Sequence, residues 1–132
     1  MAYCDRTGKL PQRAFKAAKF SKDAKKANIS DAELCEAICQ VMAVQADELG
    51  GGVFKKRLNN NMHRSIVLAK GGMYWVYEYL FAKNVRENIE NDELMAFRLL
   101  AKSYAGLTEL QVKHLVSDQH FVEICHDDKA QV

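Results

Sequence analysis

Hydrophobic residues recur along this chain at two different spacings, and the changes in spacing separate the predicted elements. In the middle of the chain, hydrophobic and polar residues alternate over residues 53–59, an apolar run occupies Ile66–Leu68 within residues 63–70, and residues 73–83 are rich in aromatic residues. These patterns predict three strands, over residues 53–59, 63–70 and 73–83. Before and after this region hydrophobic residues recur every three or four residues, which is typical of helices with one buried side. The predicted helices cover residues 13–26, 30–49, 92–104 and 108–116, and a last short strand covers residues 121–125. This order predicts an α+β domain in which N-terminal helices pack on a small curved antiparallel sheet.

Polar residues at the predicted helix ends support this division. Ser30 and Glu33 form a capping box, in which the hydroxyl accepts from the Glu33 amide and the Glu33 carboxylate reaches back to the Ser30 amide. Thr108 and Gln111 repeat the pattern at the last helix. The three glycines at 50–52 are expected to end the second helix, because glycine accepts left-handed backbone angles. They lack the spacing of a phosphate-binding loop, and they follow a predicted helix rather than a strand.

The strand predicted over residues 73–83 carries large residues on both faces. Strict alternation places Trp75, Tyr77, Tyr79 and Phe81 on one face of it. A strand that is bulky on both sides is expected at the centre of a sheet, so we interpret the aromatic residues as core rather than as a base-stacking surface. The glycine pair at 71–72 predicts the hairpin turn that leads into this strand.

Length and composition place limits on the class of protein. The 132 residues, of which 48% are hydrophobic and 27% charged, suit one domain spanning residues 1–132. Gly8 and Pro11 interrupt any regular pattern near the start, so residues 1–12 are expected to be loosely held. The sequence has no apolar run of membrane-spanning length and no evident secretory signal, which predicts a soluble protein.

The four cysteines stand at positions 4, 35, 39 and 125. No two of them form a C-x-x-C pair, and the further ligands of a zinc site are missing. We therefore expect free or buried thiols in a reducing cytoplasm. A metal site at Cys125 and His126 is the weaker alternative, and we otherwise expect no metal and no cofactor.

Charge is distributed in blocks although the formal net charge is only +2. Residues 1–28 carry eight Lys or Arg against two acids, and residues 29–52 carry five acids with no Lys or Arg. Residues 53–86 carry seven Lys or Arg against one acid, and residues 87–132 carry nine acids against four Lys or Arg. The basic block falls on the predicted strands, where it could form a local anion-binding surface.

A cluster of cations without acids or metal ligands is compatible with RNA cleavage. The 2′-hydroxyl of RNA can attack the adjacent phosphate, so that a protein need only align the attack, move protons and stabilise charge. Arginine suits the last task because its planar fork holds phosphate oxygens bidentately. Alternation places Lys55 and Arg57 on one face of their strand. It places Arg64 on the side of Ile66 and Leu68, so that Arg64 is expected to join them only from a frayed strand end.

The chain resembles the RelE/HigB-like toxins of bacterial toxin–antitoxin modules. The resemblance lies in three segments in a fixed order: ISDAELCEAI, then LGGGVFKKRL, then an arginine strand and a strand ending in FAKN before an acidic helix start. It extends over about residues 29–102. It implies a fold like that of microbial ribonucleases and metal-independent cleavage of mRNA in the ribosomal A site. The short Asn59–Met62 loop departs from relatives, which often have a Gly- and Lys-rich loop there.

The resemblance also implies roles for single residues. Arg64 and Lys83 are expected to bind the phosphate and stabilise charge in the transition state, and His63 is a candidate proton carrier. The expected catalytic residues are Arg64, Lys83, Lys55, Arg57 and His63, and the expected RNA-binding residues are Lys56, Asn84, Lys70 and Arg86.

Partners follow from the same resemblance. A cognate antitoxin is expected, in many relatives a helix-turn-helix protein, so that operator DNA would be reached only through the antitoxin. The other partner is mRNA on the ribosome, with no membrane involved. Two alternatives keep the fold: a ParE-like inhibitor of DNA gyrase without nuclease activity, and an inactive domain that only binds the antitoxin.

Overall fold

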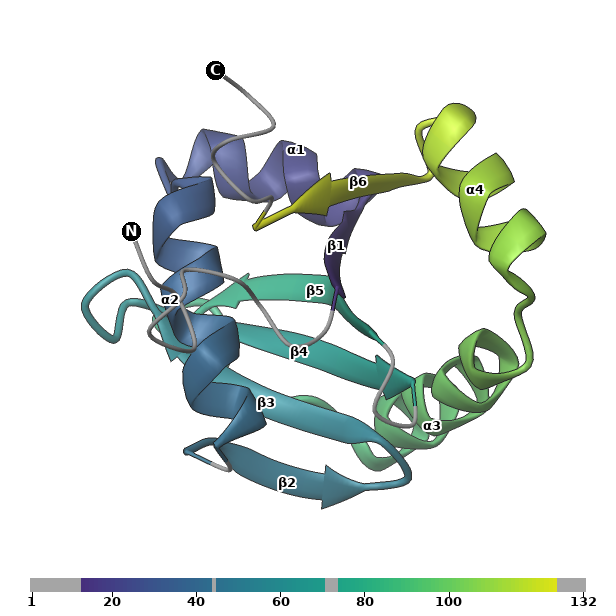
Figure 1. Ribbon diagram of the computed structural model, residues 1–132. Helices are drawn as coiled ribbons and strands as arrows, with labels where there is room; N and C mark the ends of the chain where they lie inside the picture. The colour runs from purple at the N-terminus through teal and green to yellow at the C-terminus, as the bar shows by residue number, and fades with distance from the viewer. Residues whose placement is uncertain (1–12, 44, 71–73, 126–132) are drawn as a thin grey trace.

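The computed structural model describes residues 13–43, 45–70 and 74–125, and these build one six-stranded sheet with helices on both faces (Figure 1). The segment expected to be loosely held, 1–12, the turn expected at 71–72 and His126 of the alternative metal site lie outside the described residues.

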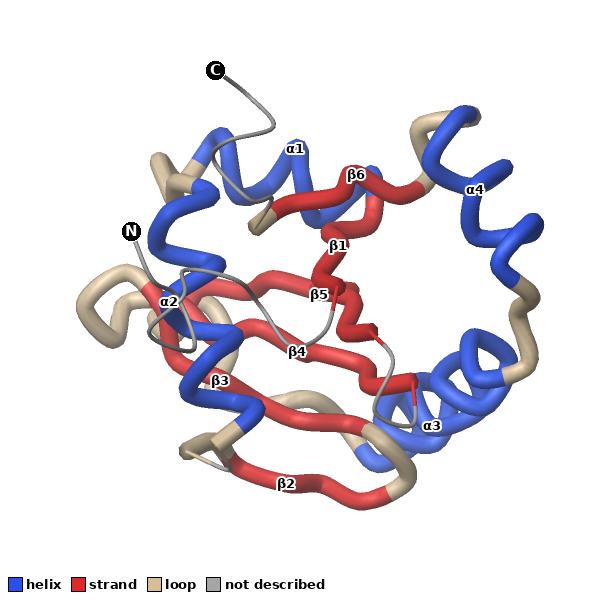
Figure 2. Tube along the Cα trace, in the orientation of Figure 1, coloured by secondary structure: helices blue, strands red, loops and turns tan. Residues whose placement is uncertain are grey.

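The order of elements is traced in Figure 2. It runs β1 (Arg13–Ala17), α1 (Ala18–Lys26), α2 (Asp31–Met42), β2 (Asp47–Gly50), β3 (Val53–Leu58), β4 (His63–Lys70), β5 (Tyr74–Ala82), α3 (Asn91–Ala105), α4 (Glu109–Ser117) and β6 (Phe121–Ile124). In the sheet the strands lie in the order β2-β3-β4-β5-β1-β6. The predicted strands of the central region, the two C-terminal helices and the last strand are confirmed to within about two residues, as is the capping box at Thr108.

The first predicted helix is wrong over its first five residues. Arg13–Ala17 form β1, which pairs in parallel with β5 and antiparallel with β6. Ala14 and Phe15 are both fully buried, on opposite faces of the sheet. Pairing on both edges and burial on both faces outweigh the helix propensity of this Ala- and Lys-rich segment. As a result the sheet is mixed and larger than the small antiparallel sheet expected, and the helices are not confined to the N-terminal part of the chain.

The second predicted helix ends early. α2 stops at Met42 and is followed by β2, so Gly50 ends β2 and Gly51 and Gly52 form the turn of the β2–β3 hairpin instead of a helix end. The φ angles of the three glycines are 85°, 65° and 81°, in the left-handed region that favours glycine. A Cβ on Gly51 would lie 2.8 Å from Cγ of Arg98, whose guanidinium donates to the carbonyl of Leu49. Contact with α3 therefore keeps the turn free of side chains.

The capping box at the start of α2 is only half formed. The Ser30 hydroxyl accepts from the Glu33 amide at 3.1 Å, as predicted. The Glu33 carboxylate does not return to Ser30; it accepts from the backbone amide of Asn59, at the end of β3.

Strict alternation along β5 is also wrong, because the strand contains a bulge. Tyr77 lies opposite Val67 and Tyr79 opposite Ile66, so Glu78 is an extra residue in β5. Tyr77 packs with Phe20 on the face covered by α1 and α2, whereas Tyr79 belongs to the cluster under α3. The aromatic residues still form core, but on both faces of the sheet.

The helices leave one end of the sheet uncovered. α1 and α2 cover one face, where the Tyr77 hydroxyl donates to the carbonyl of Leu34 at 2.7 Å. α3 and α4 lie on the other face, with α3 over a cluster that includes Val53, Ile66 and Leu68 (Figure 1). Further along β3 and β4 on this second face, apolar side chains give way to cations.

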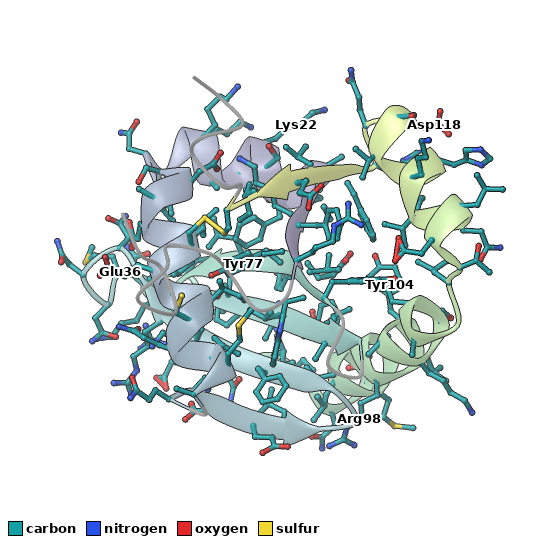
Figure 3. The ribbon with its side chains drawn as sticks, in the orientation of Figure 1. Lys22, Glu36, Tyr77, Arg98, Tyr104 and Asp118 are labelled. Carbon is teal, nitrogen blue, oxygen red and sulfur yellow. A yellow bond between two sulfur atoms is a disulfide. The ribbon has the colours of Figure 1, made fainter. Side chains whose placement is uncertain are left out.

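The expectation of free thiols is wrong for the described cysteines. Cys35 on α2 and Cys125 after β6 form a disulfide with a Cα–Cα distance of 5.4 Å, visible as the sulfur–sulfur bond in Figure 3. Cys39 is disulfide-bonded as well. The pairing of β6 with β1 brings residue 125 next to α2, across 90 residues of sequence. Spacing along the chain gives no indication of that proximity.

Candidate active site

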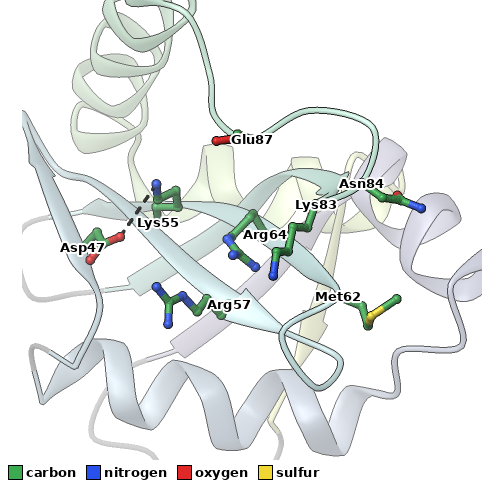
Figure 4. A pocket seen from close by; sticks show the side chains of 8 residues that line it. All are labelled: Asp47, Lys55, Arg57, Met62, Arg64, Lys83, Asn84 and Glu87. Carbon is green, nitrogen blue, oxygen red and sulfur yellow. Dashed lines mark ion pairs between the residues drawn. The ribbon is translucent and has the colours of Figure 1, made fainter.

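A cavity of about 540 Å³ opens at the uncovered end of the sheet (Figure 4). β2, β3 and β4 line it together with the turn before β4 and the loop after β5. Its lining residues are Asp47, Lys55, Arg57, Met62, Arg64, Lys83, Asn84 and Glu87. Five of the nine expected site residues are therefore brought together here: Lys55, Arg57, Arg64, Lys83 and Asn84.

Strand register places these cations on one face. Arg57 of β3 lies directly opposite Arg64 of β4, and Lys55 lies opposite Ile66. Paired residues in an antiparallel ladder point to the same side of the sheet, so Arg64 needs no frayed strand end to join the cluster. The predicted separation of Arg64 from Lys55 and Arg57 is wrong, because Ile66 and Lys55 lie on the same face of the sheet.

Arg64 is fixed in place by backbone acceptors. Only 9% of the residue is exposed, and its Nη1 donates to the carbonyl of Asn61 at 3.0 Å and to the carbonyl of His63 at 3.2 Å. A buried guanidinium needs such partners, because an unsatisfied buried charge is costly. The bonds are made through one nitrogen, and the side chain still lines the cavity.

The other cations of the cavity differ in whether their side chains have polar partners. Lys55 Nζ lies 3.7 Å from Asp47 Oδ2 and 3.4 Å from Asn88 Oδ1. Within residues 13–43, 45–70 and 74–125, the side chains of Arg57 and Lys83 make no hydrogen bond or ion pair, and both residues are exposed. Two cations therefore remain open to an anion beside the fixed Arg64.

Two carboxylates that the sequence did not indicate also line the cavity. Asp47 was expected in a helix and instead lies on β2, and Glu87 comes from the loop after β5. The acid predicted within the strand region, Glu78, lies elsewhere: its Oε1 accepts from the hydroxyl of Tyr104 at 2.8 Å. Four cations against two carboxylates leave the cavity with an excess of positive charge.

Lys56 and His63 fall on the opposite face of the sheet. Lys56 Nζ donates to the carbonyl of Gln45 at 3.0 Å, and its pKa is lowered by burial and by the neighbouring Arg57. His63 lies opposite Leu58 in the ladder, with its Nδ1 3.2 Å from Nδ2 of Asn59. Neither residue lines the cavity.

Arg86 and Lys70 also lie apart from the cluster. The Arg86 guanidinium binds the Glu93 carboxylate, at 3.0 Å for one pair of atoms, and donates to the Tyr79 hydroxyl at 3.2 Å. The hydrogen bond to Glu93 raises the pKa of Arg86 further. Lys70 stands at the far end of β4 from Arg64, with its backbone opposite Tyr74.

The excess of positive charge makes the cavity better suited to an anion such as phosphate than to a cation. A fixed guanidinium with two uncommitted cations beside it can surround a phosphodiester and stabilise added negative charge on it. Among the described residues, no group of three or more His, Cys, Asp and Glu side chains is placed to hold a metal ion. None of the described helices is both long and apolar enough to span a membrane.

Comparison with known proteins adds a family. A family model described as the RelE toxin of the RelE/RelB toxin–antitoxin system matches residues 12–124 of the chain. Searches of curated proteins and of solved structures gave no significant match.

Proposed function

Because the chain belongs to the RelE toxin family, we propose that it acts as the toxin of its module by cutting mRNA on the ribosome. One observation carries this proposal: Arg64 is buried and held by two carbonyls, and it lines the same cavity as the unpaired Lys83 and Arg57. The cavity thus combines one charge held by hydrogen bonds with two exposed charges that have no partner among the described residues, which suits the binding and stabilisation of a phosphate.

The proposed reaction needs no group that the chain lacks. The 2′-oxygen of one nucleotide attacks the adjacent phosphorus and gives up its proton, while the bond from phosphorus to the 5′-oxygen breaks and that oxygen gains a proton. The products are a 2′,3′-cyclic phosphate and a new 5′-hydroxyl end. Arg64 and Lys83 would stabilise the charge on the phosphorane, and Lys55, Arg57 and Asn84 would hold the RNA backbone. The proposal is therefore a metal-independent endoribonuclease.

One binding partner of the protein is implied by its family, and the other partners are proposed here. Membership of the RelE toxin family implies an antitoxin partner. We further propose that this antitoxin carries a helix-turn-helix and alone contacts operator DNA, and that the toxin works in the cytoplasm, where translated mRNA is found. Among the other expected residues, Lys56 remains a proposed contact to RNA beyond the cavity.

A cell-free translation reaction tests the proposal. Purified protein is added during synthesis of a defined peptide, and mRNA ends are mapped by primer extension with wild type, Arg64→Ala and Lys22→Ala. Lys22 is an exposed lysine of α1, outside the cavity, so its variant controls for the loss of one positive charge. We expect new 5′ ends with wild type and Lys22→Ala, and we expect them to appear about 10²- to 10³-fold more slowly with Arg64→Ala.

The alternatives give different results in the same reaction. Intact mRNA with continuing translation would overturn the nuclease proposal. An assay of DNA gyrase supercoiling with the same protein then separates a gyrase inhibitor from a domain that only binds its antitoxin.

A further inference from the structure

The half-formed capping box of α2 gives Glu33 a different partner. Its carboxylate accepts from the backbone amide of Asn59, which directly follows β3. A hydrogen bond to an ionised carboxylate is about twice as strong as one between neutral groups. One end of the β3–β4 turn is therefore tied to a helix on the opposite side of the sheet from the cavity.

The backbone of this turn is unusual. Asn59, Asn60 and Asn61 have φ angles of 55°, 53° and 70°, which is three consecutive residues in the left-handed region. Asparagine tolerates this conformation better than other residues with a side chain, but each such residue still costs free energy. A turn built in this way needs external bonds to keep one shape, and the bond from Glu33 is one of them.

The other end of the same turn holds the buried arginine. The carbonyl of Asn61 accepts from Arg64 Nη1 at 3.0 Å, and the amide of Met62 closes the turn by donating to the carbonyl of Asn59 at 3.0 Å. A shift of the turn would carry the acceptor of Arg64 with it. Lys83 is joined to the turn as well, since its amide donates to the carbonyl of Met62 at 2.9 Å.

We propose that Glu33 is a positioning residue of the active site, which fixes the guanidinium of Arg64 through the asparagine turn. The inference rests on the proposed function for its kinetic consequence, because it assumes that Arg64 stabilises charge at the scissile phosphate. Glu33 itself does not line the cavity, so its proposed effect on cleavage is indirect. It acts by limiting how far Asn61, and with it Arg64, can move.

Glu36 offers a matched control. It stands one turn after Glu33 in α2 and is exposed (Figure 3). Both glutamates line a cleft beside the asparagine turn. In the described part of the chain the Glu36 side chain makes no hydrogen bond or ion pair. Glu36→Ala therefore removes the same charge near the basic site as Glu33→Ala does, but no bond to the turn.

The kinetic test compares Glu33→Ala, Glu33→Gln and Glu36→Ala in the translation-coupled cleavage assay. We expect Glu33→Ala to lower kcat by about ten- to a hundredfold, since a displacement on the order of 1 Å can have that effect. KM should change little, because Lys55 and Arg57 still bind the backbone. Glu33→Gln keeps an acceptor for the Asn59 amide and should retain most of the activity, and Glu36→Ala should match wild type.

A double-mutant cycle separates positioning from general support of the fold. If Glu33 acts through Arg64, then Glu33→Ala should have no further effect on cleavage in a protein that already carries Arg64→Ala. An additional loss of the same size in that background would overturn the inference. So would equal kcat values for Glu33→Ala and Glu36→Ala in folded proteins.

A second measurement does not depend on cleavage. Nitrogen-15 NMR of the Arg64 guanidinium should show restricted rotation in wild type and Glu36→Ala, and faster rotation in Glu33→Ala. If Glu33→Ala does not fold, Glu33→Leu carries the test with the same expectation, because a leucine side chain also offers no acceptor for the Asn59 amide. Unchanged rotation in the folded variant that lacks this acceptor would overturn the inference. Restricted rotation in wild type together with intact mRNA would overturn the proposed function alone.

Discussion

Nη1 of Arg64 donates to the carbonyl of Asn61 at 3.0 Å, so a catalytic candidate is anchored by the backbone of the turn that precedes its own strand. A second bond from the same nitrogen reaches the carbonyl of His63 at 3.2 Å. Because these bonds use one nitrogen of the guanidinium, the anchor and the phosphate can be bound at the same time. A lysine side chain has a single nitrogen, which would have to hold both the backbone carbonyls and the phosphate.

This geometry predicts that Arg64→Lys fails nearly as badly as Arg64→Ala. Each variant should reduce kcat for mRNA cleavage by about 10²- to 10³-fold, the usual effect of removing one preorganised donor in a transition state. The measurement is the rate of appearance of new 5′ ends in single-turnover translation reactions. If Arg64→Lys were within a few-fold of wild type in activity, cleavage would need only a positive charge at position 64 and not the anchored guanidinium.

Lys83 offers the opposite case, an exposed cation at the cavity without a partner in the described chain. Lys83→Ala should leave the thermal unfolding midpoint unchanged, because no bond of its side chain is lost. It should slow cleavage by about 10²-fold or more if the amine stabilises the phosphorane. Cleavage equal to that of the Lys22→Ala control would remove Lys83 from the mechanism.

The strands of the site could be predicted from sequence because their pattern is local. Alternation over residues 53–59 and the apolar run at residues 66–68 predicted β3 and β4 nearly residue for residue, and alternation placed Lys55 and Arg57 on a common face. What alternation does not supply is the register between strands. The position of Arg64 opposite Arg57 depends on that register, and it decides that the two side chains share a cavity.

The wrong predictions have a common physical origin in contacts between elements, which the local pattern of one segment does not show. β1 is a strand because β5 and β6 flank it, and β2 is a strand because it pairs with β3. The same holds for Asp47, which reaches the cavity only as part of β2, and for the disulfide of Cys35 with Cys125. In each case the contact with another element outweighs the secondary-structure propensity of the local sequence.

The disulfide between Cys35 and Cys125 should contribute to stability, because it closes a long stretch of chain. Its sequence separation of 90 residues predicts that its loss lowers the free energy of unfolding by about 2–5 kcal/mol. The test is denaturant unfolding of wild type and the double Cys35→Ser, Cys125→Ser variant, each with and without dithiothreitol. We expect reductant to destabilise wild type more than the double variant, and equal responses would show that this bond adds nothing.

The hydrogen bond from Tyr104 to Glu78 predicts a pH-dependent effect on stability. Burial raises the pKa of Glu78, and the bond from the Tyr104 hydroxyl lowers that pKa part of the way back. A carboxyl group with a raised pKa in the folded protein favours folding fully below its ordinary pKa. That contribution is lost as pH rises through the folded-state pKa. Above that pKa the ionised Glu78 therefore opposes folding, and the hydrogen bond from Tyr104 offsets part of this cost.

Tyr104→Phe should accordingly destabilise the protein by about 1–3 kcal/mol near pH 7, the typical cost of leaving a buried polar group without its partner. The difference from wild type should shrink as pH falls through the raised pKa of Glu78, because the carboxyl group becomes protonated there. Glu78→Gln keeps an acceptor for the Tyr104 hydroxyl and carries no charge, so it should be at least as stable as wild type at neutral pH. Unfolding midpoints of the three proteins between pH 4 and 8 measure this. A Tyr104→Phe deficit that stays constant or grows on acidification would mean that Glu78 is not the group whose ionisation Tyr104 supports.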